Sequence, residues 1–338
     1  MYQKLLGSKG EIANMKTDRL MTCASFFAGV GGIDLGFEQT GRFKVLYANE
    51  FDTYPVLTYN ENFEIKADCR DIHDVQSEDF PNVDVIMGGF PCQAFSIAGK
   101  RKGFNDEKGR GTLFFEMLRL IKEKKPRAVF FENVKNLVSH DDGNTFKVIM
   151  DSLRTVGYYC DSLVMNAMEY GNIPQNRERI YIVGFKDKAD FDRFWFPKPV
   201  KLTMTLRDVI DFTHKVDEKY YYTHGKYANN LYEKLNVAMD DPDAVYQWRR
   251  KYVRKNKSGV IPTLTANQGE GGHNVCLIRT KYGIRKMTPA ECFYAQGFPK
   301  TFRLPKIADS RLYKQAGNSV CVSVIRRIAE QMAMAMQN

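Results

Sequence analysis

Short apolar runs alternate with amphipathic segments along the first half of the chain. Five apolar runs predict strands, at 20–27, 44–48, 83–87, 128–131 and 180–185. Four segments with apolar residues at helical spacing predict helices, at 31–39, 53–60, 112–124 and 145–155. Strands that alternate with helices in this way favour an α/β fold around an open sheet.

The pattern changes after Phe196-Pro197-Lys198-Pro199. From there to about 283 the sequence is tyrosine-rich, basic and irregular, with clusters of Gly and Asn. From Met287 helical periodicity resumes, and 318–336 predicts one long amphipathic helix that completes a face of the sheet. The predicted organisation is an N-terminal extension over 1–19, a first domain made of 20–199 and 284–338, and an inserted domain over 200–283.

Composition narrows the class of protein. With 338 residues, of which 43% are hydrophobic, the chain can bury a large core. No apolar run approaches the roughly 20 residues of a membrane span, and no apolar signal core stands at the N-terminus. The seven cysteines are scattered singly, which predicts neither a disulfide framework nor a metal site. We therefore expect a protein of the reducing cytoplasm, without membrane or metal.

Charge indicates a polyanionic partner, because the formal net charge is +10. Between Tyr246 and Lys257 aromatic and basic residues interleave and no acid occurs. A solvated surface usually mixes both signs, so this stretch predicts contacts with nucleic acid. The candidate side chains, for phosphates or guanine edges, are Arg249, Arg250, Lys251 and Arg254.

A cofactor site is predicted where Phe27-Ala28-Gly29-Val30-Gly31-Gly32 joins the first strand to the first helix. Glycines there let a ligand approach the amides of a helix N-terminus, although a short Gly-x-Gly is often only a tight turn. Glu50 ends the second strand, where a carboxylate commonly holds ribose hydroxyls, and Phe51 follows as a partner for adenine. The competing interpretation of Glu50 is an acid at a helix N-terminus. Asp71 and Ile72 are further candidates for the adenine, or a simple surface turn. The spacing does not fit a dinucleotide, so we expect a smaller nucleoside cofactor.

A reactive cysteine is the next candidate. Gly88-Gly89-Phe90-Pro91-Cys92-Gln93 follows a predicted strand, at the point where an open sheet presents side chains to its ligand crevice. Taken alone, such a cysteine is more often a buried thiol than a nucleophile. Glu132 ends the next apolar strand, where a buried carboxyl must be used or paired. Arg177 and Arg179 alternate onto one face of the following strand, or else form an exposed edge of self-paired charges.

In this order the motifs resemble those of the DNA (cytosine-5) methyltransferase family. The resemblance covers nearly the whole chain from Leu20 onward except the inserted region. The segments that carry it are the glycine loop, Pro91-Cys92-Gln93, Glu132-Asn133-Val134, Gln175-Asn176-Arg177-Glu178-Arg179 and Gln315-Ala316-Gly317-Asn318-Ser319-Val320. It implies a Rossmann-like catalytic domain that uses S-adenosylmethionine, with a target recognition domain inserted where the composition changes. The chain departs from the family at Ser25, where many relatives carry an acid that contacts the cofactor amino group.

The resemblance also implies a mechanism. Cys92 adds as a thiolate to carbon 6 of a cytosine flipped out of double-stranded DNA, and carbon 5 then takes the methyl group. Glu132 holds ring nitrogen 3 and the exocyclic amine, while Arg177 binds the ring oxygen, with Arg179 as a further catalytic candidate. Further cofactor contacts are implied for Pro91, Leu113, Asn318, Ser319 and Val320. Further DNA contacts are implied for Gln93, Lys100, Arg101, Thr263 and Leu264, with Lys100 and Arg101 in a basic loop that closes over DNA.

Other functions remain open. One branch of the family methylates tRNA, although the long basic insert favours duplex DNA. A DNA-binding protein without catalysis is a second alternative, against which the joint presence of Cys92, Glu132 and Arg177 argues. A thiol hydrolase is disfavoured because none of the five histidines forms a convincing Cys-His arrangement. We expect a monomeric bacterial or phage enzyme of the restriction-modification type, which protects host DNA from a cognate endonuclease.

Overall fold

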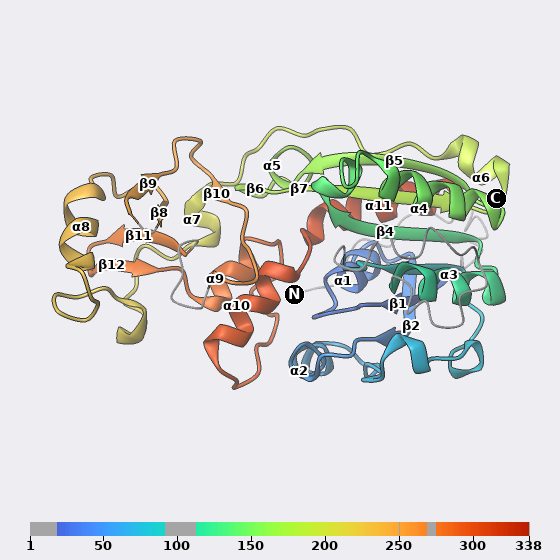
Figure 1. The fold of residues 1–338 in the computed structure, drawn as a ribbon, viewed down its shortest axis with the longest axis horizontal. Coiled ribbons are helices and arrows are strands. Elements are labelled where there is room, and N and C mark those ends of the chain that lie inside the picture. Colours follow the sequence, from blue (N-terminus) through green and yellow to red (C-terminus); the bar gives the residue numbers. More distant parts are fainter. Residues whose placement is uncertain (1–18, 92–112, 250, 269–274, 338) are drawn as a thin grey trace, which may run out of the picture.

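The protein, as a computed structural model, is described over residues 19–91, 113–249, 251–268 and 275–337. Its larger part is built on a six-stranded sheet with the order β2-β1-β3-β4-β7-β5 (Figure 1). The strands are β1 (Met21–Phe26), β2 (Phe43–Asn49), β3 (Val85–Gly88), β4 (Ala128–Val134), β5 (Tyr159–Asn166) and β7 (Glu178–Phe185). β2, β1, β3 and β4 run parallel, and β7 runs antiparallel to both its neighbours. The parallel strands therefore end along one edge, where the predicted site residues lie.

Helices cover both faces of this sheet. One face packs against α1 (Gly32–Glu38), α5 (Ala167–Tyr170), α6 (Lys188–Arg193) and α11 (Val322–Ala335). The other face packs against α3 (Leu113–Lys124) and α4 (Asn144–Thr155), while α2 (Thr53–Asn62) packs beside the end of β2. In β3, Val85 and Met87 enter the first layer and Ile86 enters the second. A strand covered on both faces is apolar throughout, and this explains why it was easy to predict.

The spacing of apolar residues in α3 explains why this segment forms a helix. Phe114, Met117, Leu118 and Ile121 are buried and recur every three or four positions, which makes one apolar stripe. Burying one side chain of this size contributes roughly 1.5–3 kcal/mol. Basic residues in the last turn suit the negative end of the helix dipole.

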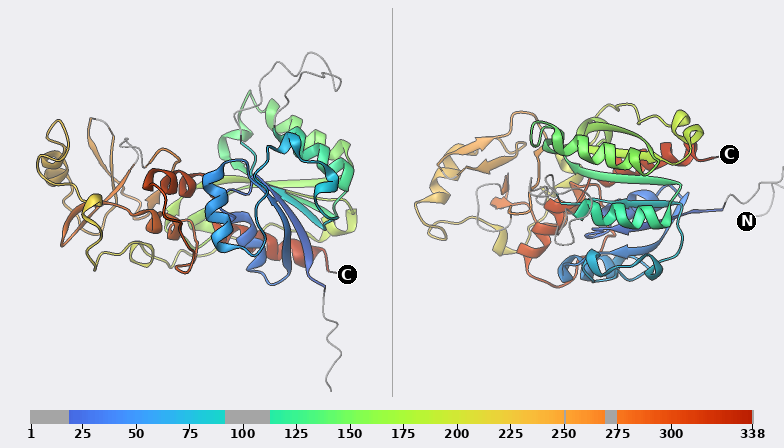
Figure 2. Two further views of the ribbon diagram at one scale, coloured as in Figure 1. Left: turned by 90° about the horizontal axis from the view of Figure 1, so that it is seen from below. Right: turned by 45° about the vertical axis from the view of Figure 1, so that its right-hand side comes forward.

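A second, four-stranded sheet lies in the inserted region, with the order β12-β11-β8-β9. Its strands are β8 (Tyr246–Trp248), β9 (Val253–Lys255), β11 (Cys276–Thr280) and β12 (Gly283–Lys286). Helix α8 (Leu231–Ala238) packs on one face of it. Figure 2 shows from two further directions that this sheet stands beside the large one, with helices of the C-terminal region, drawn in red, between them. The predicted domain boundary at 283/284 falls inside β12.

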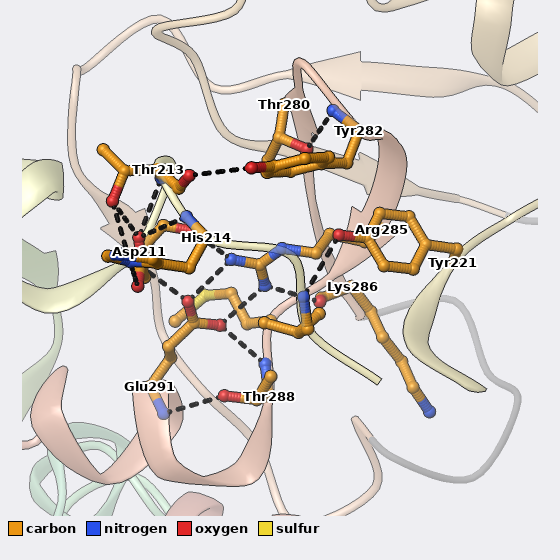
Figure 3. A network of polar contacts seen from close by, with 12 residues as sticks. Asp211, Thr213, His214, Tyr221, Thr280, Tyr282, Arg285, Lys286, Thr288 and Glu291 are labelled. Carbon is orange, nitrogen blue, oxygen red and sulfur yellow. Dashed lines mark hydrogen bonds and ion pairs between the residues drawn. The ribbon is translucent and has the colours of Figure 1, made fainter. Parts of the chain in front are cut away.

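A buried ion pair joins the two ends of the inserted region (Figure 3). The chain enters through α7 (Leu206–Val209) and leaves through β12 into α9 (Pro289–Tyr294). Arg285, at the end of β12, donates to both carboxylate oxygens of Glu291 in α9, at 2.7 and 2.8 Å. The backbone of Asp211, just after α7, donates to Glu291 and accepts from Arg285. One pair of side chains therefore ties the entering segment to the leaving segment.

The structure confirms the predicted strands and helices of the first half and differs in three places. The helix predicted over 318–336 is present as α11 but starts later, at Val322, because α10 (Asp309–Asn318) ends at Asn318 and extended backbone follows at Ser319. Strand β5 was not predicted, because an edge strand with half-exposed residues lacks a continuous apolar run. The inserted region, expected to be irregular, contains the small sheet.

Short strands and 3₁₀ helices complete the description of residues 19–91, 113–249, 251–268 and 275–337. β6 (Gln175–Asn176) pairs in parallel with β10 (Ile261–Pro262), and this ladder links the large part of the molecule to the inserted region. The 3₁₀ helices are Ile72–Asp74, Ser77–Asp79, Lys135–Val138 and Glu218–Tyr220. None of the helices in the described ranges has the length and apolar character needed to cross a membrane.

Candidate active site

The glycine loop between β1 and α1 has the backbone shape of a ligand site. Phe27, Gly29 and Gly31 have positive φ angles of 52°, 56° and 83°. A bulky residue such as Phe27 adopts that conformation only under constraint, and such constraint is typical of functional loops. A side chain built at Gly29 would meet nothing within 4 Å, so the loop faces open space.

Glu50 holds this loop from the end of β2. Its Oε2 accepts the N–H of Gly29 at 2.9 Å and its Oε1 accepts the N–H of Asp52 at 2.8 Å. Asp52 caps helix α2 by accepting from Tyr54, and Glu50, which accepts from Asp52, also lies near the N-terminus of that helix, as the competing interpretation expects. Burial raises the pKa of Glu50, while the two backbone N–H groups act to lower it. Phe51 beside it exposes 68% of its surface, which leaves its ring available to a ligand.

The opposite side of the loop is formed by the break between α10 and α11. A side chain at Gly32 would come within 2.7 Å of Ser319 Oγ and 2.9 Å of a methyl group of Val320. The absence of a Cβ at Gly32 therefore lets the C-terminal segment reach the start of α1. Asn318 is exposed next to it. The fold thus brings the predicted cofactor residues from both ends of the chain together.

The other predicted cofactor residues are more dispersed. Asp71 is exposed; it caps a 3₁₀ helix and pairs with His73. Ile72 is buried in the core between β1 and α3, so its side chain is not available to a ligand. Pro91 is exposed at the end of the turn after β3, and Leu113 is half-buried at the start of α3.

A buried acid, Asp34, lies below the loop and is hydrogen-bonded to Ser25. Ser25 Oγ donates to Asp34 Oδ2 at 2.8 Å, and the Tyr59 hydroxyl donates to Asp34 Oδ1 at 2.9 Å. Burial raises the pKa of Asp34 to about 6, although both hydrogen bonds act to lower it. Sequence reasoning missed Asp34; its signal was an acid on the buried face of a predicted helix.

The predicted catalytic residues lie around Glu132 in β4. Arg179 of β7 lies across the strand pair, with its Nε 3.1 Å from Glu132 Oε1. Burial raises the pKa of Glu132, while the charges of Arg179 and then Arg177 act to lower it. A Cβ at Gly89 would stand 3.3 Å from Glu132 Oε2, so the second carboxylate oxygen faces the turn after β3.

Asn133 fixes that turn. Its Nδ2 donates to the Phe90 carbonyl at 2.8 Å, and both residues are buried. Pro91 follows directly, so the segment that leads to the predicted nucleophile is anchored beside Glu132. Cys92 itself lies outside the described residues, as do Gln93, Lys100, Arg101 and Arg250. The role of Asn133 was not predicted, although it belongs to a motif that the sequence analysis singled out.

Arg177 does not have the contacts predicted for it. Its guanidinium donates to the backbone carbonyls of Leu264, Gly317 and Ser319, and only 2% of the residue is exposed. These bonds engage both terminal nitrogens, so the expected contact with a pyrimidine oxygen is not supported by the geometry. Arg179, which the sequence analysis placed second, is the arginine paired with Glu132.

The residues predicted to contact DNA differ in how accessible their side chains are. Thr263 is half-buried, and its hydroxyl donates to the Asn176 carbonyl at 2.7 Å. Leu264 is buried at 1% exposure in the core around α9, so a DNA contact through its side chain is not supported. Lys251 and Arg254 are exposed on the β8–β9 hairpin, and Arg249 is exposed where its N–H bonds the Tyr252 carbonyl across the hairpin.

The family model of C-5 cytosine-specific DNA methylases matches residues 21–334, nearly all of the chain. The chain belongs to the C-5 cytosine-specific DNA methylase family. The type II methyltransferase M.Bsp6I of Bacillus sp. (strain RFL6) is 56% identical over 317 residues, which cover 94% of this chain and 100% of that protein. The type II methyltransferase M.HhaI of Haemophilus parahaemolyticus is 38% identical over 319 residues, which cover 92% of this chain and 93% of that protein.

Solved structures share the fold of this methylase. The S. pombe Dnmt2 methyltransferase superposes with a TM-score of 0.70 at 16% identity, covering 95% of this chain and 100% of that one. A putative DNA modification methyltransferase from an E. coli prophage gives 0.66 at 21% identity, covering 94% and 100%. The predicted Rossmann-like methyltransferase fold is thereby confirmed. Among the described residues of the methylase, no group of three or more His, Cys, Asp or Glu side chains is arranged to hold a metal ion.

Proposed function

We propose that this methylase transfers a methyl group to carbon 5 of a cytosine flipped out of a short sequence in double-stranded DNA, and that Cys92, Glu132 and Arg179 carry the reaction. The observation that supports it most directly is the Glu132–Arg179 pair at 3.1 Å, buried beside the turn that leads to Pro91. Membership of the C-5 cytosine-specific DNA methylase family supports the reaction class. The resemblance to type II methyltransferases supports a role in protecting DNA from a cognate endonuclease.

The residues around the glycine loop fit S-adenosylmethionine. Gly29 faces open space, Glu50 presents a carboxylate whose remaining lone pairs suit ribose hydroxyls, and Phe51 offers an exposed ring for adenine. Ser319 and Val320 close the far side of the loop. When bound, this cofactor supplies an electrophilic methyl group.

Glu132 and Arg179 are suited to activate the pyrimidine ring. Burial raises the pKa of Glu132, so that its carboxyl can hold a proton at ring nitrogen 3 while the nucleophile adds. Arg179 is fixed next to it as a cation for the ring oxygen, where negative charge develops. Arg177 is engaged elsewhere, so we assign this role to Arg179.

Cys92 supplies the covalent step. Its thiolate adds to carbon 6, and the electron pair displaced from the ring double bond makes carbon 5 nucleophilic toward the methyl group. A base then removes the carbon 5 proton, and the resulting electron pair expels the Cys92 thiolate and restores the double bond. The bond from sulfur to carbon 6 therefore forms and breaks once in each turnover.

Sequencing of methylated cytosines in DNA from cells that express the protein would test the reaction and give the site. We expect methylation at one short sequence and its loss in Cys92→Ala. The purified protein should form a cofactor-dependent covalent complex with a duplex that carries 5-fluorocytosine at the target. Preferential labelling of tRNA over duplex DNA, with both supplied side by side, would contradict the proposed substrate.

A further inference from the structure

Arg177 is a fully charged side chain in the interior, bonded almost entirely to backbone. Its Nη1 donates to Leu264 O at 2.9 Å, and its Nη2 donates to Gly317 O at 3.2 Å and to Ser319 O. Its Nε is buried without a partner. Burial lowers the pKa of this guanidinium, and the charge of Arg179 adds to the effect. A residue held at this energetic cost requires a structural or functional explanation.

The three carbonyls belong to two separate segments. Gly317 and Ser319 end helix α10 beside the glycine loop, whereas Leu264 belongs to the segment 261–268, which we call the recognition loop. The last carbonyls of a helix lack partners within it and form the negative end of its dipole, so a cation is favourable there. The planar guanidinium fork can bond in two directions at once, which an ammonium group does less well.

The recognition loop lies on the same part of the chain as Arg177. Ile261 and Pro262 pair with Gln175 and Asn176 in the β10–β6 ladder. The side chain of Gln175 accepts the Leu264 N–H at 3.2 Å and donates to the Ala295 carbonyl at 2.5 Å. Thr263, half-buried between these contacts, is therefore held on the strand that leads into Arg179.

Gly317 shows how closely the loop approaches α10. A Cβ at Gly317 would lie 2.2–2.5 Å from backbone atoms of Thr265 and Ala266. Backbone cannot move aside as the end of a flexible side chain can, so any larger residue there must push the loop away. The position of the loop therefore depends on two residues. Arg177 holds the loop through its hydrogen bond to Leu264, and Gly317 leaves room for the loop because it has no side chain.

We propose that Arg177 is a positioning residue, which locks the recognition loop to the end of α10 and so sets bound DNA in register with Glu132, Arg179 and the cofactor loop. This inference rests on the proposed function, because it takes the recognition loop as a DNA-binding segment. It separates the two arginines of one motif: Arg179 acts on the base, and Arg177 acts on the loop that holds the DNA around it.

Two duplexes containing the methylation site would test this role, one with the target cytosine and one with an abasic position in its place. An abasic target removes every contact to the base but keeps the contacts to the surrounding DNA. We expect Arg177→Lys to weaken the affinity for both duplexes equally, by about tenfold. Gly317→Ala should have the same effect, since it displaces the loop by steric contact and does not alter the guanidinium itself.

Arg127→Lys is the matched control. Arg127 precedes β4 and pairs with buried Asp190, far from the recognition loop in sequence and at the opposite end of the strand from Glu132. We expect this variant to lower the melting temperature but to keep both affinities within about twofold. Such a result would show that destabilisation alone does not weaken DNA binding.

Two results would overturn the inference. Loss of affinity for the cytosine duplex alone would make Arg177 a base-contacting residue. A lower melting temperature with both affinities unchanged, in Arg177→Lys and Gly317→Ala alike, would make it a purely structural one. Failure of the proposed function would be seen separately, as a wild-type protein that leaves DNA unmethylated.

Discussion

Three carboxyl groups at the candidate site share a raised pKa but differ in the groups that bond them. Glu50 is bonded by backbone amides, Asp34 by two hydroxyls and Glu132 by a guanidinium. Amides and hydroxyls of the protein hold a carboxylate in place, whereas the charged guanidinium of Arg179 has further donors that can bind a substrate beside Glu132. The three groups therefore differ in function: the first two shape the cofactor loop, and the third is available for chemistry.

Replacing Arg179 by Gln tests the assignment of the catalytic cation. The variant loses the charge that lowers the pKa of Glu132 and the donor for the ring oxygen. We expect the single-turnover rate of methyl transfer to fall about 100-fold, with DNA affinity changed less than about threefold. Rapid-quench measurement with labelled cofactor would show this. An unchanged rate would return the role to Arg177.

Asp34→Asn tests the buried acid below the glycine loop. Because the pKa of Asp34 is raised from 3.8 to about 6 in the folded protein, its charged form opposes folding. The native protein should therefore gain stability relative to the variant as pH falls from above 6 toward 4, by up to about 3 kcal/mol. Urea unfolding at several pH values would measure the difference. A difference that does not vary with pH would contradict the prediction.

At the scale of single residues, the sequence predicts what lies within one strand and its neighbours. Glu50 and Glu132 were found because each ends a predicted strand. The geometry favours Arg179 over Arg177 for the contact with the base, and the sequence could not indicate this, because the partners of Arg177 lie 87, 140 and 142 residues away along the chain. Nothing in the spacing of the motif identifies those carbonyls.

At the scale of elements, the junction of the inserted region depends on one ion pair. Arg285 and Glu291 are both buried and bond each other twice, and Thr288 closes a capping box with Glu291 at the start of α9. A fully formed buried pair contributes little net stability, but removing one partner leaves an uncompensated charge. The pair is therefore a sensitive point for folding.

Glu291→Gln should destabilise the protein by about 3–5 kcal/mol, because Arg285 keeps its charge without a counter-ion. The double variant Arg285→Met with Glu291→Leu should recover part of this loss. Chemical denaturation of both variants would compare them. A single variant no less stable than the double one would contradict this account.

The prediction of helices and strands from hydrophobic periodicity failed where contacts between distant segments or exposure of an edge strand decide the local structure. The segment 318–336 has helical periodicity throughout, yet Ser319 is extended and its carbonyl is taken by Arg177. The contact between Arg177 and Ser319 lies where α10 ends, and local helix propensity cannot reveal a contact between segments so far apart in the chain. Strand β5 was missed for a different reason: it is an edge strand that pairs only with β7, and most of its residues are partly or fully exposed, so it lacks a continuous apolar run.

At the scale of the molecule, the basic residues of the inserted region fall into two groups. Lys255 bonds Asp240 and Asp241, so its charge is compensated. Lys251 and Arg254 are exposed on the same hairpin and form no ion pair among the described residues. The clustering of charge was visible in the sequence, but its division into paired and free cations depends on how α8 and β9 pack.

Salt dependence of DNA binding should distinguish these groups. Each lost phosphate contact lowers the slope of log affinity against log salt by about 0.9. We expect Lys251→Ala and Arg254→Ala each to reduce the slope by about one, and Lys255→Ala to leave it unchanged. Titrations between about 50 and 200 mM salt would measure it. An equal change in all three variants would show that the ion pairs of Lys255 do not prevent it from contacting DNA phosphates.

The meeting of Gly32 with Ser319 and Val320 has a consequence for synthesis of the protein. The first helix leaves the ribosome long before the segment that meets it, because most of the chain lies between Gly32 and Ser319. A growing chain therefore lacks the complete predicted cofactor site until Ser319 and Val320 have been added. Chains that end before Ser319 should remain unable to methylate DNA.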